Sequence, residues 1–281
     1  MSYPFGGHEA SIAFCEELSY GELPAEPFWY PPFLVEDLEP TVGRANINIR
    51  GLGSRDLHAI KKGLQQASLK FTKFLQTYGT LEVIDAAWSD TLRSFYVEVL
   101  YEKGSEYVSL RFPGSRFDKV TVSCEIEDVI KAKCELIAQK ALTATSKLRT
   151  SGDPYSEPPY AWYDSYVKKN TTVLERVTSW SWSVANNLKR VPVIRSSDGD
   201  ILKYLPWRHR DITGALVFEF ETKEEADDVL NDTEFTLEIG LGGTHKAVFS
   251  NCKWSQVTIP TTIADLAYLK APFTAKSISV S

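Results

Sequence analysis

The sequence has few of the residues that build disulfide frameworks or metal sites. Its 281 residues include four cysteines and four histidines. The cysteines form no Cys-x-x-Cys pair and are too few for the framework of a disulfide-rich domain. No two histidines have the spacing of zinc ligands, so no metal or cofactor is expected. We expect free thiols at Cys15, Cys124, Cys134 and Cys252.

Long apolar runs and an excess of positive charge are also missing. No window approaches 18 consecutive apolar residues, so we expect no membrane-spanning helix. Residues Met1 to Glu17 contain three glutamates and no lysine or arginine, unlike a secretory signal, which favours folding in a cytoplasm. The net charge of −6 does not suit a protein that grips nucleic acid by its phosphates. A surface past which DNA slides remains compatible with this charge.

The signatures of common catalytic sites are absent from the sequence. It contains no GxSxG, GxxxxGK[ST] or GxGxxG motif. The letters His-Arg-Asp at 209–211 occur in kinase catalytic loops, but Leu216 stands where such a loop requires Asn. Asp198 and Asp200 could hold a cation, although a turn is the commoner role of such a pair. We therefore do not expect an enzyme.

Two irregular aromatic segments divide the chain. Residues Glu26 to Pro40 and Ser151 to Tyr163 combine prolines with aromatic side chains, which excludes a regular helix or a central strand. The second segment lies near the middle of the chain, where a linker between two halves would lie. Exposed aromatic residues on such segments are typical of subunit contacts, although packing on the chain's own domain is the alternative. The candidate contact residues are Phe28, Trp29, Tyr30, Phe33, Tyr155, Tyr160 and Trp162.

The sequence also contains an internal repeat. Residues 112–141 align with residues 249–278 at a constant shift of 137 without a gap, and seven of the 30 positions are identical. The match preserves the apolar pattern as well as the letters, so we predict a tandem duplication, with chance similarity as the alternative. The predicted domains are an extended arm over 1–45, a first domain over 46–148, a linker over 149–170 and a second domain over 171–281.

Alternation of apolar and polar residues predicts antiparallel β-structure. In Leu216 to Glu221 and in Phe235 to Leu241, apolar side chains recur at every second position, and Gly242 and Gly243 predict a turn after the second segment. Residues 57–74 fit either a helix or a strand. Comparison with the repeat favours a strand for the second part of this segment.

A short helix is expected between these strands. Residues Thr222 to Leu230 begin with a residue that favours the N-cap position, and Glu225 stands three residues later, as in a capping box. We predict one such helix in each half.

Tryptophans in the second half allow a different function. Trp180, Trp182, Trp207 and Trp254 could form a sugar-stacking platform, which would make the chain a glycan-binding two-domain β-sandwich. Serines alternate with the first two tryptophans, however, so both point to one face of a strand. That arrangement favours a core or interface role.

The order of segments in the second half carries a family resemblance. The sequence SWSWSVANNLKRVPVI begins at Ser179 and is followed by RHRDITGALVFEFE, the short helix, a hairpin and a final segment that begins FSNCKWSQVTIP. This order resembles the tail tube proteins of long-tailed viruses. The resemblance implies a mainly β fold of two tandem tube-type β-sandwich or barrel domains that assembles into a closed ring. Three such chains would make a pseudo-sixfold ring.

The resemblance also implies a function and partners. The chain would be a structural protein of the virion tail, whose stacked rings form the hollow tube through which the genome passes; a related injection machine or tail tip is the alternative. The partners would be further copies of the chain, the tape-measure protein and viral DNA in the lumen, and the tail-tip and head-completion proteins. Like charge in the lumen would repel phosphates. The candidate lumen residues are Glu98, Glu102, Glu234 and Glu238, with an ordinary solvated face as the alternative.

Overall fold

The fold is mainly β with one short α-helix. The computed structural model describes residues 4–32, 34–76, 81, 83–149, 157–195, 197–260 and 267–281. In these residues, fifteen strands belong to one hydrogen-bonded sheet, and every pairing within it is antiparallel. Strands β3 (Ile47–Arg50) and β4 (Leu57–Lys61) form a separate hairpin. The β class predicted from alternation is confirmed.

The first half of the chain supplies one group of strands. Along the main sheet their order is β2-β5-β8-β7. The first part of β7, a strand of 20 residues, also pairs with β6 and β9, and β6 pairs with β1. The bounds are β1 (Ala10–Glu16), β2 (Val35–Arg44), β5 (Gln65–Phe74), β6 (Phe95–Lys103), β7 (Glu106–Glu125), β8 (Lys131–Ala138) and β9 (Leu142–Ala144).

The second half supplies the remaining strands. Along the main sheet their order is β12-β13-β16-β15. Strand β15 also pairs with β14 and β17, β14 pairs with β10, and β10 pairs with β11. The bounds are β10 (Val167–Lys169), β11 (Thr172–Val173), β12 (Val177–Ala185), β13 (Asp211–Glu219), β14 (Phe235–Gly240), β15 (Lys246–Trp254), β16 (Tyr268–Thr274) and β17 (Ser277–Val280).

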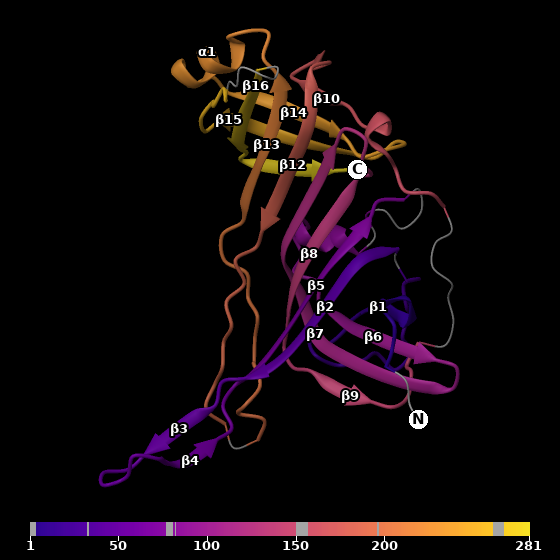
Figure 1. The fold of residues 1–281 in the computed structure, drawn as a ribbon, viewed down its shortest axis with the longest axis vertical. Helices are drawn as coiled ribbons and strands as arrows, with labels where there is room; N and C mark the ends of the chain where they lie inside the picture. The colour runs from indigo at the N-terminus through magenta and orange to yellow at the C-terminus, as the bar shows by residue number, and fades with distance from the viewer. Residues whose placement is uncertain are drawn as a thin grey trace.

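One strand pair joins the two groups into a continuous sheet. β7 and β12 are antiparallel, with a register that runs from Glu125 opposite Ser179 to Lys119 opposite Ala185. Figure 1 shows β12 and β13 lying beside β7 and β8, so that the second group continues the first. We call this pair the internal joint.

The core lies on one face of the main sheet because the strands alternate. Val120 and Val122 of β7 are buried, whereas Thr121 between them is not fully covered. On the neighbouring strand, Trp180 and Trp182 are buried in the same core and the serines between them lie on the opposite face. The core role of these two tryptophans is confirmed.

The four cysteines are free and buried. Burial raises the pKa of Cys15 and Cys124 to about 11 and the pKa of Cys134 and Cys252 to about 12. The native thiols are therefore protonated and poorly reactive near neutral pH.

The helical elements differ in part from the prediction. The α-helix α1 (Glu224–Leu230) lies in the second half, and its N-cap is Lys223 rather than Thr222. The capping box was wrong because Glu225 is buried and forms an ion pair with Arg176 instead of reaching back along the helix. The other helical elements of the described chain are the 3-10 turns η1 (Gly7–Glu9), η2 (Ile84–Ala87) and η3 (Trp162–Asp164), so the prediction of a short helix in each half holds for the second half only. In the described part, no helix is long and apolar enough to span a membrane.

The segment that fitted both a helix and a strand is extended. Its first part is β4 and its second part is β5, as the repeat favoured. The predicted turn after β14 is also confirmed, because Gly242 and Gly243 both have positive φ angles, of 97° and 57°, which favour glycine.

An arm projects from one end of the molecule. Residues 45–64, which contain β3 and β4, extend away from the main sheet (Figure 1). From here on we call this segment the arm; it is not the N-terminal segment 1–45 that was predicted to be extended. The connection from β12 to β13 meets the base of the arm, where Asp200 forms ion pairs with Arg44 at 2.5 Å and Lys62 at 3.3 Å. Asp200 is thus engaged by the protein's own basic side chains.

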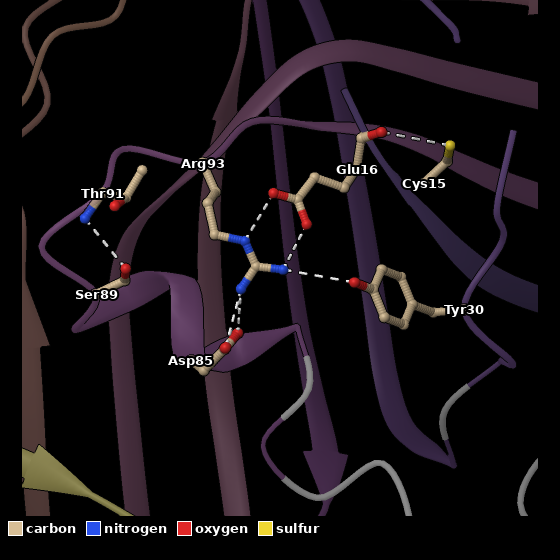
Figure 2. A network of polar contacts seen from close by, with 7 residues as sticks. All are labelled: Cys15, Glu16, Tyr30, Asp85, Ser89, Thr91 and Arg93. Carbon is tan, nitrogen blue, oxygen red and sulfur yellow. Dashed lines mark hydrogen bonds and ion pairs between the residues drawn. The ribbon is translucent and has the colours of Figure 1, made fainter. Parts of the chain in front are cut away.

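A partly buried arginine fastens the N-terminal segment to the first half (Figure 2). The Arg93 guanidinium donates hydrogen bonds to both carboxylate oxygens of Glu16, at 2.9 and 2.6 Å, and to both of Asp85, at 2.8 and 2.9 Å. It also reaches the Tyr30 hydroxyl at 3.5 Å. Arg93 therefore ties together β1, the segment after it and the turn η2.

Arg93→Gln is expected to loosen this attachment. The substitution removes a planar donor that serves two carboxylates, so the free energy of unfolding should fall by about 1–2 kcal/mol. Urea unfolding monitored by tryptophan fluorescence measures the change. Arg50→Gln, on the exposed arm, is the control, and an equal loss in both variants would contradict the role given to Arg93.

Candidate assembly interfaces

The main sheet has two outer borders in the described chain, one at β2 and one at the residues that follow β15. β2 pairs with β5 on one side only. At the other end, β15 stops at Trp254, and the chain after it hydrogen-bonds to β16 through Ser255 and Thr258. Unpaired backbone N–H and C=O groups along a border are a template for pairing with another chain.

The face of the main sheet opposite the core is rich in hydroxyl groups. At the internal joint, Thr121 lies opposite Ser183, whose hydroxyl is 3.1 Å from that of Thr213 on the next strand. We call this the open face. Its other polar side chains on β7, β8, β12 and β16 include Lys119, Ser123, Lys133, Ser181, Lys270 and Thr274.

Glu98, one of the four predicted lumen residues, lies inside the protein. Its side chain is 1% exposed. The carboxylate accepts hydrogen bonds from the Ser109 hydroxyl at 2.7 Å and from the backbone N–H groups of Leu148 and Arg149 at 3.0 and 3.1 Å. The prediction that Glu98 lies on an accessible face is corrected, because the chain after β9 folds over it.

The other three predicted lumen glutamates have partners as well. Glu102 lies 3.0 Å from Lys147. Glu234 precedes β14 and accepts a hydrogen bond from Asn251, which lowers the pKa of its carboxyl. Glu238 accepts a hydrogen bond from the Tyr166 hydroxyl at 2.7 Å and pairs with Lys168, and these contacts lower its pKa. All are on β6 or at β14, outside the row of strands with the open face; their place in a channel stays a prediction.

Glu98→Gln is expected to destabilise the fold. Glutamine keeps one acceptor oxygen but places an NH2 group where the other carboxylate oxygen stood, so one of the two backbone N–H groups loses its acceptor. Leaving a buried donor unpaired costs about 1–3 kcal/mol. Thermal unfolding of the pure protein should show a lower Tm. Glu102→Gln is the matched control, because an exposed ion pair contributes about 1 kcal/mol or less. Similar Tm values for the two variants would contradict the analysis.

The predicted contact residues of the N-terminal segment are partly packed on their own half. The backbone of Trp29 forms an isolated antiparallel β-bridge with Cys15, and the Trp29 ring packs edge-on against the Tyr96 ring at a centroid distance of 6.5 Å. Tyr30 packs against the core, whereas Phe28 is 71% exposed. Phe33 and Tyr155 lie outside the described residues. A role of these side chains in subunit contacts stays a prediction.

The second aromatic segment borders a groove. The backbone of Tyr160 bonds to Leu75 and Ile130, so this residue is held against the first half. Trp162 is 43% exposed and lines a groove of about 350 Å³ together with Tyr163, β10, β11 and the ends of β7 and β12. Sequence reasoning missed Tyr163, although it is next to Trp162, and it missed the exposed apolar residues of the arm, which were hidden by the ambiguity of residues 57–74.

A long antiparallel sheet whose outer strand β2 has one sheet neighbour in the described chain is typical of a protein that assembles with other chains. A sequence model of the phage tail tube protein family matches residues 7–275, nearly the whole chain. The chain therefore belongs to the phage tail tube protein family. It is a structural rather than an enzymatic protein of the virion tail, and tail tube proteins self-assemble. A comparison with curated proteins found no match.

Proposed function

We propose that three copies of the chain close a pseudo-sixfold ring, and that such rings stack into the tube through which the genome passes into the host. The proposal requires the two halves to be copies of one module. The strand order supports this: β2-β5-β8-β7 in the first half corresponds to β12-β13-β16-β15 in the second, and β1-β6-β7-β9 corresponds to β10-β14-β15-β17.

Individual residue pairs agree with the repeat in the sequence. Phe117 pairs with Leu136, and the residues 137 positions later, Trp254 and Phe273, also pair. Thr121 pairs with Lys133, and the bridge between Thr258 and Lys270 stands at the same shift. Chance similarity of sequence would not reproduce the hydrogen-bonding register.

The internal joint is the observation that carries the proposal. It pairs the end of β7 with β12, and the equivalents of these two segments are the residues around Thr258 and β2, which lie at the two outer borders of the main sheet. A contact between these borders on successive copies would repeat the internal joint. The contact is heterologous, because it joins two different borders of successive copies. It closes a ring when the rotation between neighbouring copies is a whole fraction of a full turn, and closure then pairs every sheet border.

The register of this contact between subunits follows from the internal joint. Leu38 and Trp180 occupy the same place in the two halves, because each is reached from equivalent residues, Cys134 and Ala271, through two strand pairings. Three residues further along, Thr41 is therefore the counterpart of Ser183. Since Thr121 lies opposite Ser183, Thr258 should lie opposite Thr41 of the next copy. The two series of paired residues are Cys134–Phe71–Leu38 and Ala271–Leu216–Trp180.

The open face is the face that we assign to the channel. A ring closed through β2 and residues 255–260 turns one face of the main sheet inward, and the core side is already covered by β1, β6, β14 and β17. On this face the Ser183 and Thr213 hydroxyls contact each other at 3.1 Å, and Lys119 stands opposite the acidic Glu135 of β8. The tape-measure protein and then viral DNA would occupy this channel, which would end at the tail-tip and head-completion proteins.

A disulfide between copies tests the ring. Directly opposed residues of antiparallel strands have Cα atoms about 4.5–5.5 Å apart, which suits a disulfide. Thr41→Cys with Thr258→Cys should therefore cross-link under mild oxidation, and non-reducing gels should show species of two and three chains but no longer series. The native cysteines are buried and do not compete.

Thr121→Cys with Ser183→Cys is the matched control, because these residues face each other within one chain and should give only an intrachain bond. A double variant at 41 and 258 that stays entirely monomeric would reject the joint. Series that extend past three chains would reject the three-chain ring. Electron microscopy of the assembled protein should show a central hole and a pseudo-sixfold wall.

A lysine in the channel tests the assignment of the open face. Ser183→Lys should slow DNA release from virions, because each ring would add cations that attract phosphates, and added salt should reduce the effect. The release rate of DNA is measured after triggering with receptor or detergent. Ser277→Lys, on exposed β17, should leave release unchanged. Equal release rates for both variants would place another face in the channel.

A further inference from the structure

We propose that the arm of one copy seats in the groove beside Trp162 of a copy in the adjacent ring. The inference rests on the proposed function and names the contact that stacks the rings. Figure 1 shows β3 and β4 at one end of the longest axis, whereas β10 and the start of β12, which line the groove, lie toward the other end near α1. An arm and a groove at opposite ends can meet only between different copies.

The arm carries apolar side chains that nothing in the described chain covers. All four residues of β3 are exposed. Leu52 at its tip is fully exposed, and Ile60 is 61% exposed. An isolated hairpin is marginally stable in water, and a contiguous exposed apolar patch marks a surface that binds another molecule. The other exposed apolar residues of the arm are Ile47, Ile49 and Leu57.

The groove offers a matching apolar surface. Its lining includes Trp180 and Val177 of β12, Val167 of β10 and Cys124 of β7. Side chains around it are exposed although they are apolar or aromatic: Ile126, Trp162, Tyr163 and Val173. A hairpin laid in this groove would cover apolar surface on both partners, at about 25 cal/mol for each Å² removed from water.

Charge complementarity selects the arm as the occupant. The arm holds four basic residues and one acidic residue, Asp56. The groove is lined by the carboxylates of Glu125 and Glu175, and the turn that follows Glu125 adds Glu127 and Asp128, of which Asp128 also contacts Lys131 at 3.3 Å. Opposite charges on the two surfaces favour this pairing over arm to arm or groove to groove. The basic residues of the arm are Arg50, Arg55, Lys61 and Lys62, of which Lys62 also contacts Asp200 of its own chain at 3.3 Å.

The arrangement has the symmetry that a tube needs. Each chain has one arm with β3 and β4 and one groove beside the internal joint. A head-to-tail contact between the arm of one copy and the groove of another, directed along the tube axis, forms no closed ring. It can therefore add one ring after another without limit. The sheet borders would thus close the ring, and the arm and groove would extend the tube.

Charge reversal on each side tests the contact. Arg50→Glu with Arg55→Glu should leave ring formation intact and reduce the fraction of stacked rings about tenfold or more, because repulsion replaces attraction. Glu125→Arg with Glu127→Arg should do the same. The combination of all four changes should restore stacking, which a defect of folding would not. Sedimentation measures the stacked fraction, and electron microscopy shows rings and tubes.

A cross-link locates the contact. In a Cys124→Ser background, which removes the native thiol that lines the groove, Leu52→Cys with Tyr163→Cys should give covalent series of many chains in oxidised tubes, whereas either single variant should give none. The native thiols are buried and protonated, so the introduced pair is the reactive one.

The outcomes separate this inference from the proposed function. Tubes that form normally with either charge reversal, or a four-fold variant that does not recover stacking, would overturn the arm contact. The arm contact would also be overturned if the variant with Leu52→Cys and Tyr163→Cys gave no covalently linked chains in oxidised tubes. A wild-type chain that forms neither rings nor tubes, or that lacks the cross-link between Thr41→Cys and Thr258→Cys, would instead overturn the ring on which the contact depends.

Discussion

The backbone of a sheet border needs hydrogen-bond partners, and this need organises the whole molecule. Within the chain, β12 satisfies the border of β7, and the same core then runs from one half into the other. Strand β2 has β5 as its one sheet neighbour in the described chain, and the residues after β15 pair with β16 at Thr258. The requirement that is met once inside the molecule is, in our proposal, met again between molecules, so a single kind of contact would build the wall of the tube.

Much of this architecture is encoded locally and could be predicted. Alternation along β13 and β14 indicated half-buried antiparallel strands because the side chains of a strand point to opposite faces. The position of β5 came from the repeat, since its own residues fit a helical stripe equally well. The capping box failed for a non-local reason: Arg176, far from Glu225 in sequence, takes the carboxylate that a local pattern assigns to the helix backbone.

The candidate surfaces were less accessible to sequence reasoning. Glu98 alternates with apolar neighbours as an exposed residue would, but Leu148 and Arg149 cover it, and no pattern within β6 contains that information. The arm and the groove are distant in sequence and lie at opposite ends of the molecule, so their complementarity becomes visible only when both are placed in space (Figure 1). Periodicity reports the burial of a strand by its own sheet, not by a segment that arrives from elsewhere.

The two halves also differ where α1 stands. The second half places an α-helix between β13 and β14, whereas the helical element that the described residues of the first half place between β5 and β6 is the short 3-10 turn η2. Three chains in a circle would therefore carry three helices on six otherwise similar sectors. A protein that binds these helices would find three sites in each ring rather than six. The tube could therefore bind a trimeric protein at its end, while the wall of its channel keeps nearly sixfold symmetry.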